Sequence, residues 1–513
     1  MRSLKLSSLL FIFIILLLSY PFKSISQVSI HQLVSDGKLA EVIKLLDSGT
    51  DVDTRDEDSL TPLMTACLHG ELEIAKVLIE RGANLNTIDL ESNAVVFYAI
   101  DSEDPDILKL ILDHKANPNA KNAGGYPAII HALDYGDDLI ELLLDAGANI
   151  NTTDYNGMTL LSHLVNDRDY TYAQKIVGLG ANVNVKDEMG TPILVVALRN
   201  RDFEFADYLI SQNASPNLTD KEGASVLMHV LQAKQNTLAN KLIMAGADLN
   251  LHDQWGQTTL IFAMQFADPD IINLLLDKNA EIRGKSRIGE TALIIAISKS
   301  YTTIAKRLID MGISTKSRDR LNRTPLLVAA NLGNLELVNY MLSKGVSSSE
   351  TFNDGKSLLM LVAESANAIP EVVEVLVKSG QKVNPQDYNG TNALMYACKS
   401  GNLEVVKKLI QLGGDFGSAD LFGKTILHYA AEGGHVSVIK YLVEVNGRSV
   451  YLIDKNKRWT PLHYAVYNNH LEAVKYLVEQ KSTINAEDID GNSPFRICTN
   501  PEIKNYLSPL GGR

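Results

Sequence analysis

Two histidines lie beside a pair of glycines in residues 418–447. His428 and His435 flank the Gly433-Gly434 pair. Imidazole is the usual side chain for acid–base chemistry near neutral pH, and glycine-rich loops can hold phosphate groups. Taken alone, the stretch is typical of an active segment. Whether it is one depends on whether these residues are special to this place in the chain.

The same pattern recurs throughout the chain, which argues against a single active segment. Ala430, the small residue at the centre of the first apolar run, has counterparts at intervals of 32 to 35 residues, mostly 33. A second series of Gly or Asn, which includes Gly413 and Asn446, ends the second apolar run with the same period. Both residue types tolerate the left-handed conformation that commonly ends a helix. Two independent series with one period predict a tandem repeat of turn, helix, turn, helix and stop.

The repeated motifs resemble those of ankyrin-repeat proteins. The first-helix motif reads TPLMTA at 61–66, TPLLVAA at 324–330, TILHYAA at 425–431 and TPLHYA at 460–465. The tail motif reads GANLN at 82–86, GANIN at 147–151, GANVN at 180–184 and GADLN at 246–250. The resemblance covers nearly everything after residue 28. It implies an all-α ankyrin-repeat solenoid of about 15 β-turn/helix–helix units, both caps included.

The N-terminus differs from the repeats and is typical of a secretory signal peptide. Arg2 and Lys5 precede an apolar run over residues 9–18, and Ser24 and Ser26 supply the small residues of a cleavage site. The run is shorter than the ~20 residues of a spanning helix. We predict a signal peptide at residues 1–26 and an exported protein, periplasmic or secreted. An uncleaved N-terminal membrane anchor is the alternative.

Residues 27–513 are predicted to form the repeat array. Residues 27–53 are predicted as an N-terminal cap unit, 54–487 as the main repeats, and 488–513 as a truncated C-terminal cap unit. No segment of this part is apolar for long enough to span a membrane, so the mature chain is predicted without a span. Longer connections near residues 364–370 and 447–456 predict local irregularities.

The charge of the chain argues against nucleic acid as a partner. It carries 48 Lys and Arg against 61 Asp and Glu, a formal net charge of −13. Binding to a phosphate backbone needs a basic surface, so no nucleic acid is expected.

The three cysteines, Cys67, Cys398 and Cys498, lie where other repeats carry Ala, Val or Leu. They are predicted as buried apolar residues, too far apart for a disulfide.

The pattern does not support catalytic or metal chemistry. His428 and His463 recur in the first-helix motif, and His435 and His470 begin second helices. The ankyrin resemblance implies hydrogen bonding around the turn for the first two. The sequence contains no nucleophile elbow, phosphate-binding loop or zinc motif. We therefore predict no enzymatic activity, no metal and no cofactor.

An acidic residue opens the second helix in five units. At this position a carboxylate can cap free backbone amides and complement the helix dipole, so a structural role is predicted. A cation-binding ridge is the alternative. The five residues are Asp104, Asp137, Asp169, Asp202 and Asp268.

Seven basic residues gather in two successive turns and are predicted as a partner-binding patch. They are Arg283, Lys285, Arg287, Lys316, Arg318, Arg320 and Arg323. In the ankyrin resemblance these turns project as fingers, so two stacked fingers would form a positive patch on a negative protein. Such a patch would steer and orient an acidic partner more than it would add affinity. Solvated turn charges are the alternative.

Large aromatic side chains at finger tips are further candidates, because aromatic residues often anchor interfaces. They are Trp255, Tyr155, Tyr388 and Phe422. For Trp255, packing within the array is an equally open alternative. Trp459 precedes a Thr-Pro-Leu motif and is predicted to pack within the array.

Together these features predict a non-enzymatic scaffold for protein–protein interaction. It would bind an unidentified protein partner through the concave face and the finger turns of its stacked repeats. Stacked repeats offer a long, preorganised surface, which limits the ordering cost of binding. The alternative is an exported accessory or protective factor that binds and modulates an enzyme or a small ligand. An intrinsic enzyme is a distant third.

Overall fold

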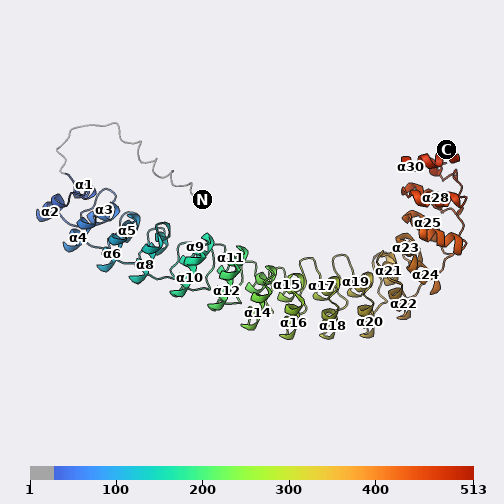
Figure 1. Ribbon diagram of the computed structural model, residues 1–513, viewed down its shortest axis with the longest axis horizontal. Coiled ribbons are helices and arrows are strands. Elements are labelled where there is room, and N and C mark those ends of the chain that lie inside the picture. The colour runs from blue at the N-terminus through green and yellow to red at the C-terminus, as the bar shows by residue number, and fades with distance from the viewer. Residues whose placement is uncertain (1–27) are drawn as a thin grey trace. The chain divides into compact units, whose positions relative to one another are not determined.

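The computed structural model describes residues 28–513 (Figure 1). These residues belong to two compact units. Unit 1 ends at Ser215 and unit 2 begins at Pro216. The 30 α-helices of the described residues form 15 successive pairs. The predicted all-α repeat array is therefore confirmed, whereas its division into caps and main repeats stays a prediction. The predicted signal peptide, residues 1–26, lies outside the described residues and also stays a prediction.

Unit 1 contains six helix pairs, each with a short first helix and a longer second helix. The first helices are α1 (Ile30–Ser35), α3 (Pro62–Leu68), α5 (Val95–Asp101), α7 (Ala128–His131, continued by the 3₁₀ turn η1, Ala132–Asp134), α9 (Leu160–Asp167) and α11 (Ile193–Arg199). The second helices are α2 (Leu39–Asp47), α4 (Leu72–Glu80), α6 (Pro105–Asp113), α8 (Asp137–Asp145), α10 (Tyr170–Gly178) and α12 (Phe203–Ser211).

Unit 2 contains the other nine pairs. The first helices are α13 (Val226–Gln232), α15 (Thr259–Phe266), α17 (Ala292–Ser298), α19 (Pro325–Asn331), α21 (Leu358–Glu364), α23 (Ala393–Ser400), α25 (Ile426–Gly433), α27 (Pro461–Tyr467) and α29 (Pro494–Ile497). The second helices are α14 (Asn236–Met244), α16 (Pro269–Asp277), α18 (Thr302–Asp310), α20 (Leu335–Ser343), α22 (Pro370–Lys378), α24 (Leu403–Gln411), α26 (Val436–Lys440), α28 (Leu471–Glu479) and α30 (Pro501–Leu507). Short helical turns are η2 (Asn353–Gly355), η3 (Tyr441–Val445, a π turn) and η4 (Ser508–Leu510).

Helix α19 shows how the sequence specifies a first helix. Thr324 is extended, and its Oγ1 accepts a hydrogen bond from the N–H of Leu327 at 3.4 Å. Pro325 takes the first helical position, where an N–H would have no partner inside the helix. Gly333 follows the helix with a φ of 68°, a conformation that disfavours a side chain. The cap, the proline and the glycine together limit the helix to two turns.

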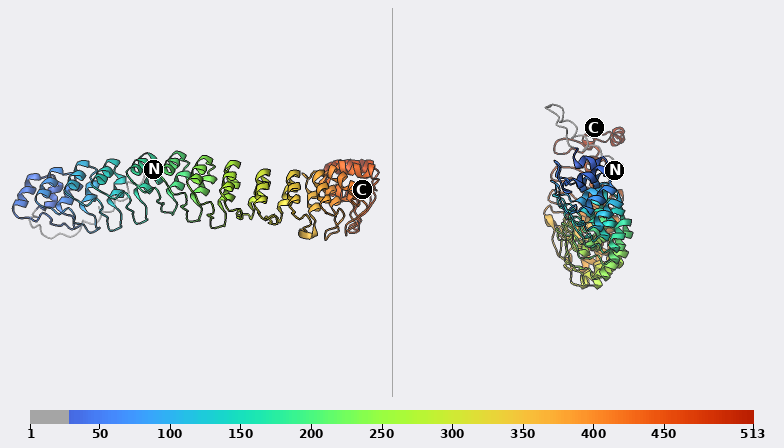
Figure 2. Two further views of the ribbon diagram at one scale, coloured as in Figure 1. Left: turned by 90° about the horizontal axis from the view of Figure 1, so that it is seen from below. Right: turned by 90° about the vertical axis from the view of Figure 1, so that its left-hand side faces the viewer.

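Within each unit, first helices pack on first helices and second helices on second helices. In unit 2, α17 contacts α19 and α18 contacts α20, and Figure 2 shows the pairs following one another along the unit. Leu293 and Ala296 of one row and Leu308 and Leu337 of the other are 0% exposed. Each repeat thus buries its apolar faces between its two helices and against its neighbours, as a repeat architecture requires.

A tight turn, here called a finger, joins each second helix to the next first helix. An isolated antiparallel bridge closes the base of several fingers, for example between Lys285 and Thr291. An acidic residue commonly fixes the tip: Oδ1 of Asp420 accepts the backbone N–H of Phe422 at 2.9 Å and of Lys424 at 2.8 Å. The fingers are therefore ordered by short-range hydrogen bonds rather than by burial.

An asparagine ladder joins successive repeats where each finger begins. In each step, the Oδ1 of an Asn accepts a backbone N–H of the next repeat. Three steps in unit 2 join Asn217 to Asp248 (2.7 Å), Asn250 to Glu281 (3.0 Å) and Asn384 to Asp415 (2.8 Å). Three steps in unit 1 join Asn119 to Asn149 (2.7 Å), Asn151 to Asn182 (2.7 Å) and Asn184 to Ser215 (2.6 Å). At these six steps the Asn at the end of the tail motif is thus a cross-link between repeats.

Two connections depart from the regular repeat, as the sequence predicts. The connection from Glu364 to Pro370 is longer than the one from Asn331 to Leu335. The second helix that starts at Val436 runs into the π turn η3, and an extended connection follows it. No helix among residues 28–513 combines the length and the apolar character needed to cross a membrane.

Candidate functional site

The seven predicted basic residues lie in two neighbouring fingers of unit 2. These are here called the basic fingers, residues 281–291 between α16 and α17 and residues 314–324 between α18 and α19. Each finger ends in a threonine, Thr291 or Thr324, whose Oγ1 caps the following helix at 3.4 Å. Because α17 packs on α19, the two fingers are held side by side at their bases. Their tips remain exposed.

Arg287 is held in place by an aromatic ring and two polar groups. Its guanidinium lies 3.5 Å from the centre of the Trp255 ring, and its Nε donates to Oε1 of Gln257 at 2.8 Å. Its Nη2 lies 4.0 Å from Oδ2 of Asp253, a buried oxygen without a hydrogen-bond partner in the described structure. The stack leaves Trp255 47% exposed. A cation and a large ring therefore form one preorganised feature across two fingers.

Two further arginines are neutralised within the array. Arg318 pairs with Glu350 at 3.3 Å and lies 4.7 Å from the centre of the Phe352 ring. Arg323 pairs with the buried carboxylate of Asp319 at 2.8 Å. Both arginines hold the second basic finger in shape, and they contribute less positive field than the sequence predicts.

The other four predicted cations are free to meet a partner. Arg283, Lys285, Lys316 and Arg320 are all exposed. Within residues 28–513, ion pairs of the basic fingers involve Arg287, Arg318 and Arg323 and none of these four. The unpaired positive charge of the patch therefore comes from four residues rather than seven.

The two tryptophans of the chain have opposite environments. Trp459 is 6% exposed, its ring stacks on His463 with the centres 6.0 Å apart, and its Nε1 donates to Oδ2 of Asp488 at 3.1 Å. The predicted packing of Trp459 within the array is confirmed. Trp255 keeps half of its surface for solvent or for a partner.

The remaining aromatic candidates are exposed but lie neither in the basic fingers nor in the finger that contacts Arg287. Tyr155, in unit 1, is 73% exposed, and Tyr388 and Phe422, in unit 2, are 79% and 46% exposed. Tyr388 covers Gly355 of the preceding finger so closely that a Cβ there would lie 2.7 Å from its Cε1. Only Trp255 of the four shares a site with the predicted cations.

A surface hollow of about 450 Å³ adjoins the second basic finger. Leu321 and Arg323 of the finger, Leu327 and Asn331 of α19, and Phe352 of the next finger are among its lining residues. Leu321 is 64% exposed, whereas Oδ1 of Asn331 is buried without a hydrogen-bond partner in the described chain. The hollow thus offers apolar surface and one unused acceptor next to the cations.

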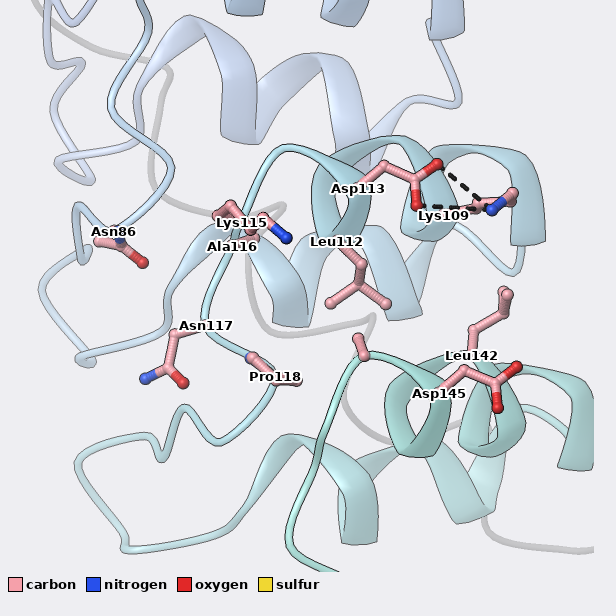
Figure 3. Close-up of a pocket in the computed structure, with 11 residues that line it drawn as sticks. Asn86, Lys109, Leu112, Asp113, Lys115, Ala116, Asn117, Pro118, Leu142 and Asp145 are labelled. Carbon is pink, nitrogen blue, oxygen red and sulfur yellow. Dashed lines mark hydrogen bonds and ion pairs between the residues drawn. The ribbon is translucent and has the colours of Figure 1, made fainter.

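A larger hollow, of about 780 Å³, lies in unit 1 and contains none of the predicted site residues (Figure 3). Asn86 and Asn117 line one part of it, and Lys109 and Asp113 of α6 form an ion pair of 3.2 Å at another. Both charged side chains are more than half exposed. An exposed i,i+4 pair of this kind is worth a few tenths of a kcal/mol. The hollow is therefore a solvated gap between repeats.

The histidines of the first-helix motif are structural. Nδ1 of His428 accepts the backbone N–H of Thr425 at 3.1 Å, so its Nε2 carries the hydrogen and donates to the carbonyl of Trp459 at 3.1 Å. Burial lowers the pKa of His428 to about 4 and lowers the pKa of His463 as well. Both rings are thus neutral cross-links between repeats at neutral pH. The predicted hydrogen bonding around the turn is confirmed.

A recurring pair of residues nine positions apart was not identified from the sequence. The Asp at a finger tip accepts a hydrogen bond from a Tyr or His of the following first helix. The pairs include Asp154 with His163 (3.0 Å), Asp220 with His229 (2.8 Å), Asp387 with Tyr396 (2.6 Å) and Asp420 with Tyr429 (2.8 Å). Asp253 has Phe262 at this spacing, which cannot donate, so Arg287 lies near a carboxylate that lacks its usual partner.

The predicted role of the acidic series is confirmed for three of its five members. Asp104, Asp169 and Asp202 each accept a backbone N–H of the first turn, at 2.9, 3.0 and 2.7 Å. The capping prediction is wrong for Asp137, which lies inside the first turn of α8. It is also wrong for Asp268, whose carboxylate instead accepts Nδ2 of Asn236 in the preceding repeat at 2.5 Å.

The three cysteines are buried as predicted. Burial raises the pKa of Cys67 to about 12 and raises that of Cys398 too, which keeps both thiols protonated and unreactive. Residues 28–513 contain no group of three or more His, Cys, Asp or Glu side chains placed to hold a metal ion.

Comparison with known proteins gives the family. A family model described as ankyrin repeats (3 copies) matches overlapping segments at residues 30–122, 101–187, 128–220, 227–319, 260–351, 326–420 and 394–488, well over half of the chain. The crystal structure of the human ASB11 ankyrin repeat domain is 21% identical, covers 44% of this chain and 99% of that domain, and has a TM-score of 0.38. That likeness is too weak to support an argument about function. No curated protein matches the chain.

Ankyrin repeats are in general modules for protein–protein interaction, and the fold is typically a scaffold without enzymatic activity. The helix pairs, the finger turns and the repeated caps of residues 28–513 all fit this architecture. The chain belongs to the ankyrin-repeat family.

Proposed function

We propose that this protein is a non-enzymatic scaffold that binds an acidic protein partner through the basic fingers of unit 2. The observation that carries the proposal is the exposed stack of Arg287, in the first basic finger, on Trp255 of the preceding finger, beside four unpaired cations of the basic fingers. Large aromatic and arginine side chains dominate interface energetics. The patch belongs to a chain with a formal net charge of −13, so it is the exception on an acidic protein.

Apolar surface surrounds this charge, as an interface requires. Ile288 and Leu321, at the tips of the two basic fingers, are 41% and 64% exposed. The adjoining hollow of about 450 Å³ lets a partner side chain reach α19. Apolar contacts at the centre and charges at the rim are the usual division in protein interfaces.

The experiment captures partners on the immobilised full chain and identifies them by mass spectrometry. The test variants are Lys285→Glu/Arg320→Glu and Trp255→Ala, because none of these side chains closes an ion pair in the array. We expect each to lower capture of the specific partner at least about tenfold, as for interface hot spots, with a shift of the thermal midpoint of at most about 2 °C.

The matched control reverses two exposed lysines in other fingers of unit 2, Lys382→Glu/Lys455→Glu. It changes the net charge by the same amount and should retain capture. Equal capture by wild type and by both test variants would rule out the basic fingers as the binding surface.

Export is proposed as well, on the pattern of Arg2, Lys5 and the apolar run at residues 9–18. Cell fractionation followed by N-terminal sequencing of the mature protein tests it. A mature chain that starts near Gln27 in the exported fraction is the expected result. A chain that keeps residues 1–26 in the cytosolic fraction would contradict it.

A further inference from the structure

The asparagine ladder stops at the basic fingers. Asn250 still accepts the N–H of Glu281, and Arg283 and Lys316 then take the next two ladder positions, 33 residues apart. Neither side chain has an oxygen to offer. Ser314 and Ser347, which follow at the spacing of ladder donors, are exposed, and their backbone N–H groups donate to no group of the described chain. These two repeat junctions, Arg283 with Ser314 and Lys316 with Ser347, are here called the open junctions.

One kind of backbone hydrogen bond between neighbouring fingers is also missing here from the described residues. At the C-terminal fingers of unit 2, the backbone N–H of Tyr388, Leu421, Lys455 and Ile489 each donates to a carbonyl of the preceding finger, at 2.9, 3.0, 2.7 and 2.9 Å. Within the described residues, no such bond starts from the equivalent Arg287 or Arg320. At the next junction, Ser349 takes the ladder position. The two repeats are joined there by a hydrogen bond between the hydroxyls of Ser348 and Ser379, whose Oγ atoms lie 3.0 Å apart. Ladder donors without a bond in the described residues also occur elsewhere, for example at Asn117 and Lys382, but only at the open junctions does a cation take the acceptor position.

A carboxylate fits the vacant acceptor position. At the first ladder step of unit 1, Asp53 replaces Asn, and its Oδ1 and Oδ2 lie 3.0 and 3.3 Å from the backbone N of Asn84. A carboxylate oxygen therefore serves as well as an amide oxygen in this geometry. Hydrogen bonds to an ionised acceptor are about twice as strong as neutral ones. At each open junction the residue in place of the Asn is itself a cation, Arg283 or Lys316.

The second open junction has a surface hollow beside it. The hollow measures about 340 Å³, and Ile313, Thr315 and Val346 are among its lining residues. Its only two charged lining groups, Asp310 and Lys344, form an ion pair of 2.6 Å. Hydrogen bonds from Lys344 and Tyr340 hold the pKa of Asp310 below its ordinary value. Lys316 is consequently the unpaired charge at this junction.

We infer that the open junctions are two carboxylate-binding sites, and that they receive an acidic segment of the partner with carboxylates three residues apart in a polyproline II conformation. One carboxylate accepts the N–H of Ser314 beside Arg283, and the next accepts the N–H of Ser347 beside Lys316. The inference rests on the proposed function and specifies the chemistry of the partner.

The spacing of the repeats favours this conformation. Packed helices lie roughly 8–10 Å apart, so equivalent sites of neighbouring repeats have about that separation. Polyproline II has three residues per turn and a rise of about 3.1 Å per residue, which places residues i and i+3 on one face about 9 Å apart. A β-strand places same-face residues i and i+2 about 6.6 Å apart, which is too short.

The test measures binding of a fluorescent peptide of four Glu-Pro-Pro units to the full chain by anisotropy. The decisive variant is Arg283→Asn/Lys316→Asn, which supplies the missing ladder oxygens from the chain itself. We expect it to weaken peptide binding at least about tenfold, because each site loses a charge-assisted bond. It should also raise the thermal midpoint by about 2 °C, because two hydrogen bonds are gained. Lys285→Asn/Arg320→Asn is the matched control, which removes equal charge and leaves the junctions open.

Five outcomes are informative. A selective loss in Arg283→Asn/Lys316→Asn, with at most about a twofold loss in the control, supports the inference. Equal losses in both variants would contradict the inference, because peptide binding would then depend on unspecific charge attraction alone. Equal binding of a peptide with the same glutamates at alternate positions, or displacement by an equal concentration of inorganic phosphate, would overturn the spaced acidic segment. If the native partner is lost with Trp255→Ala but not with Arg283→Asn/Lys316→Asn, the proposed function stands and this inference fails.

Discussion

Two stretches of unit 2 build the same repeat with different numbers of cross-links. From Asn384 onward, a ladder step, backbone bonds between fingers and the buried His428 and Trp459 tie successive repeats together. Across the basic fingers, the ladder positions are Arg283 and Lys316, and within the described residues the finger tips are joined by side chains such as Arg287 and Gln257 and by no backbone hydrogen bond. The helical core is continuous through both. The difference shows that one part of unit 2 concentrates the cross-links between repeats, whereas another part leaves backbone donors available to a partner.

The difference is physically reasonable because the core does not depend on the fingers. Leu293, Leu308 and Leu337 are fully buried beside the open junctions. Hydrophobic burial is the dominant favourable term in folding, and a single hydrogen bond adds only about 1 kcal/mol. A repeat can therefore lose one or two cross-links and still fold, which leaves backbone donors available for recognition.

The largest expected effect separates the two tryptophans. Trp459→Ala should destabilise the C-terminal repeats by about 3–5 kcal/mol, because it empties a packed site and leaves Oδ2 of Asp488 without its donor. Trp255→Ala should cost less than about 1 kcal/mol, because half of the ring already faces solvent. Chemical denaturation of both variants measures this. Similar losses of stability would mean that Trp255 is also a core residue.

The next effect is a pH dependence confined to the C-terminal stretch. His428 has a folded pKa of about 4, below its ordinary value of 6.5, so between these values the unfolded chain binds a proton that the folded chain does not. Stability is therefore complete above about pH 6.5 and falls as the pH drops toward 4, by on the order of 3 kcal/mol. Residues 283–349 contain no histidine, so their local stability should change less.

Hydrogen exchange at pH 5 and pH 7, corrected for the intrinsic rates, measures both stretches in one experiment. His428→Gln is the control, because it removes this titrating ring and should reduce the pH dependence to the part that His463 contributes, even though it lowers stability. An equal response of residues 283–349 and of the C-terminal repeats would contradict the assignment to His428.

The smallest effect concerns single ladder steps. Asn250→Ala and Asn384→Ala should each cost about 1 kcal/mol, since each removes the acceptor of one backbone N–H. Ser349→Ala, at a ladder position without such a bond, should stay within about 0.5 kcal/mol of wild type. The midpoints of urea unfolding, compared between variants that have the same m-value, test this prediction. If all three variants are neutral, the ladder does not stabilise the array.

The sequence predicts the repeat well because its signals are local. The 33-residue period of Ala430 and Gly413, the Thr-Pro caps and the buried cysteines depend on residues that act within one helix or one turn. The burial of Trp459 follows from its place before a Thr-Pro-Leu motif. These features need no knowledge of which residues meet across repeats.

The site was predicted less completely because its contacts join different repeats. Arg287 meets Trp255 from 32 positions away, and Arg323 is neutralised by Asp319 only once the finger folds. The ladder was visible as a column of Asn at the end of the tail motif, but its acceptor role depends on a backbone N–H one repeat later. Aligning Asn250 with Arg283 and Lys316 is the signal that marks the interruption.

The central claim, that the basic fingers hold backbone donors open for an acidic partner, is tested most directly by hydrogen exchange with single-residue resolution. The amides of Ser314 and Ser347 are compared with those of Asp248 and Glu281, which donate to ladder asparagines. The expected result is fast exchange at the two serines in the free protein, slow exchange at the two ladder donors, and slowing at the serines alone when the acidic peptide binds. Equal rates at all four amides in the free protein, or no slowing at the serines with peptide bound, would contradict it.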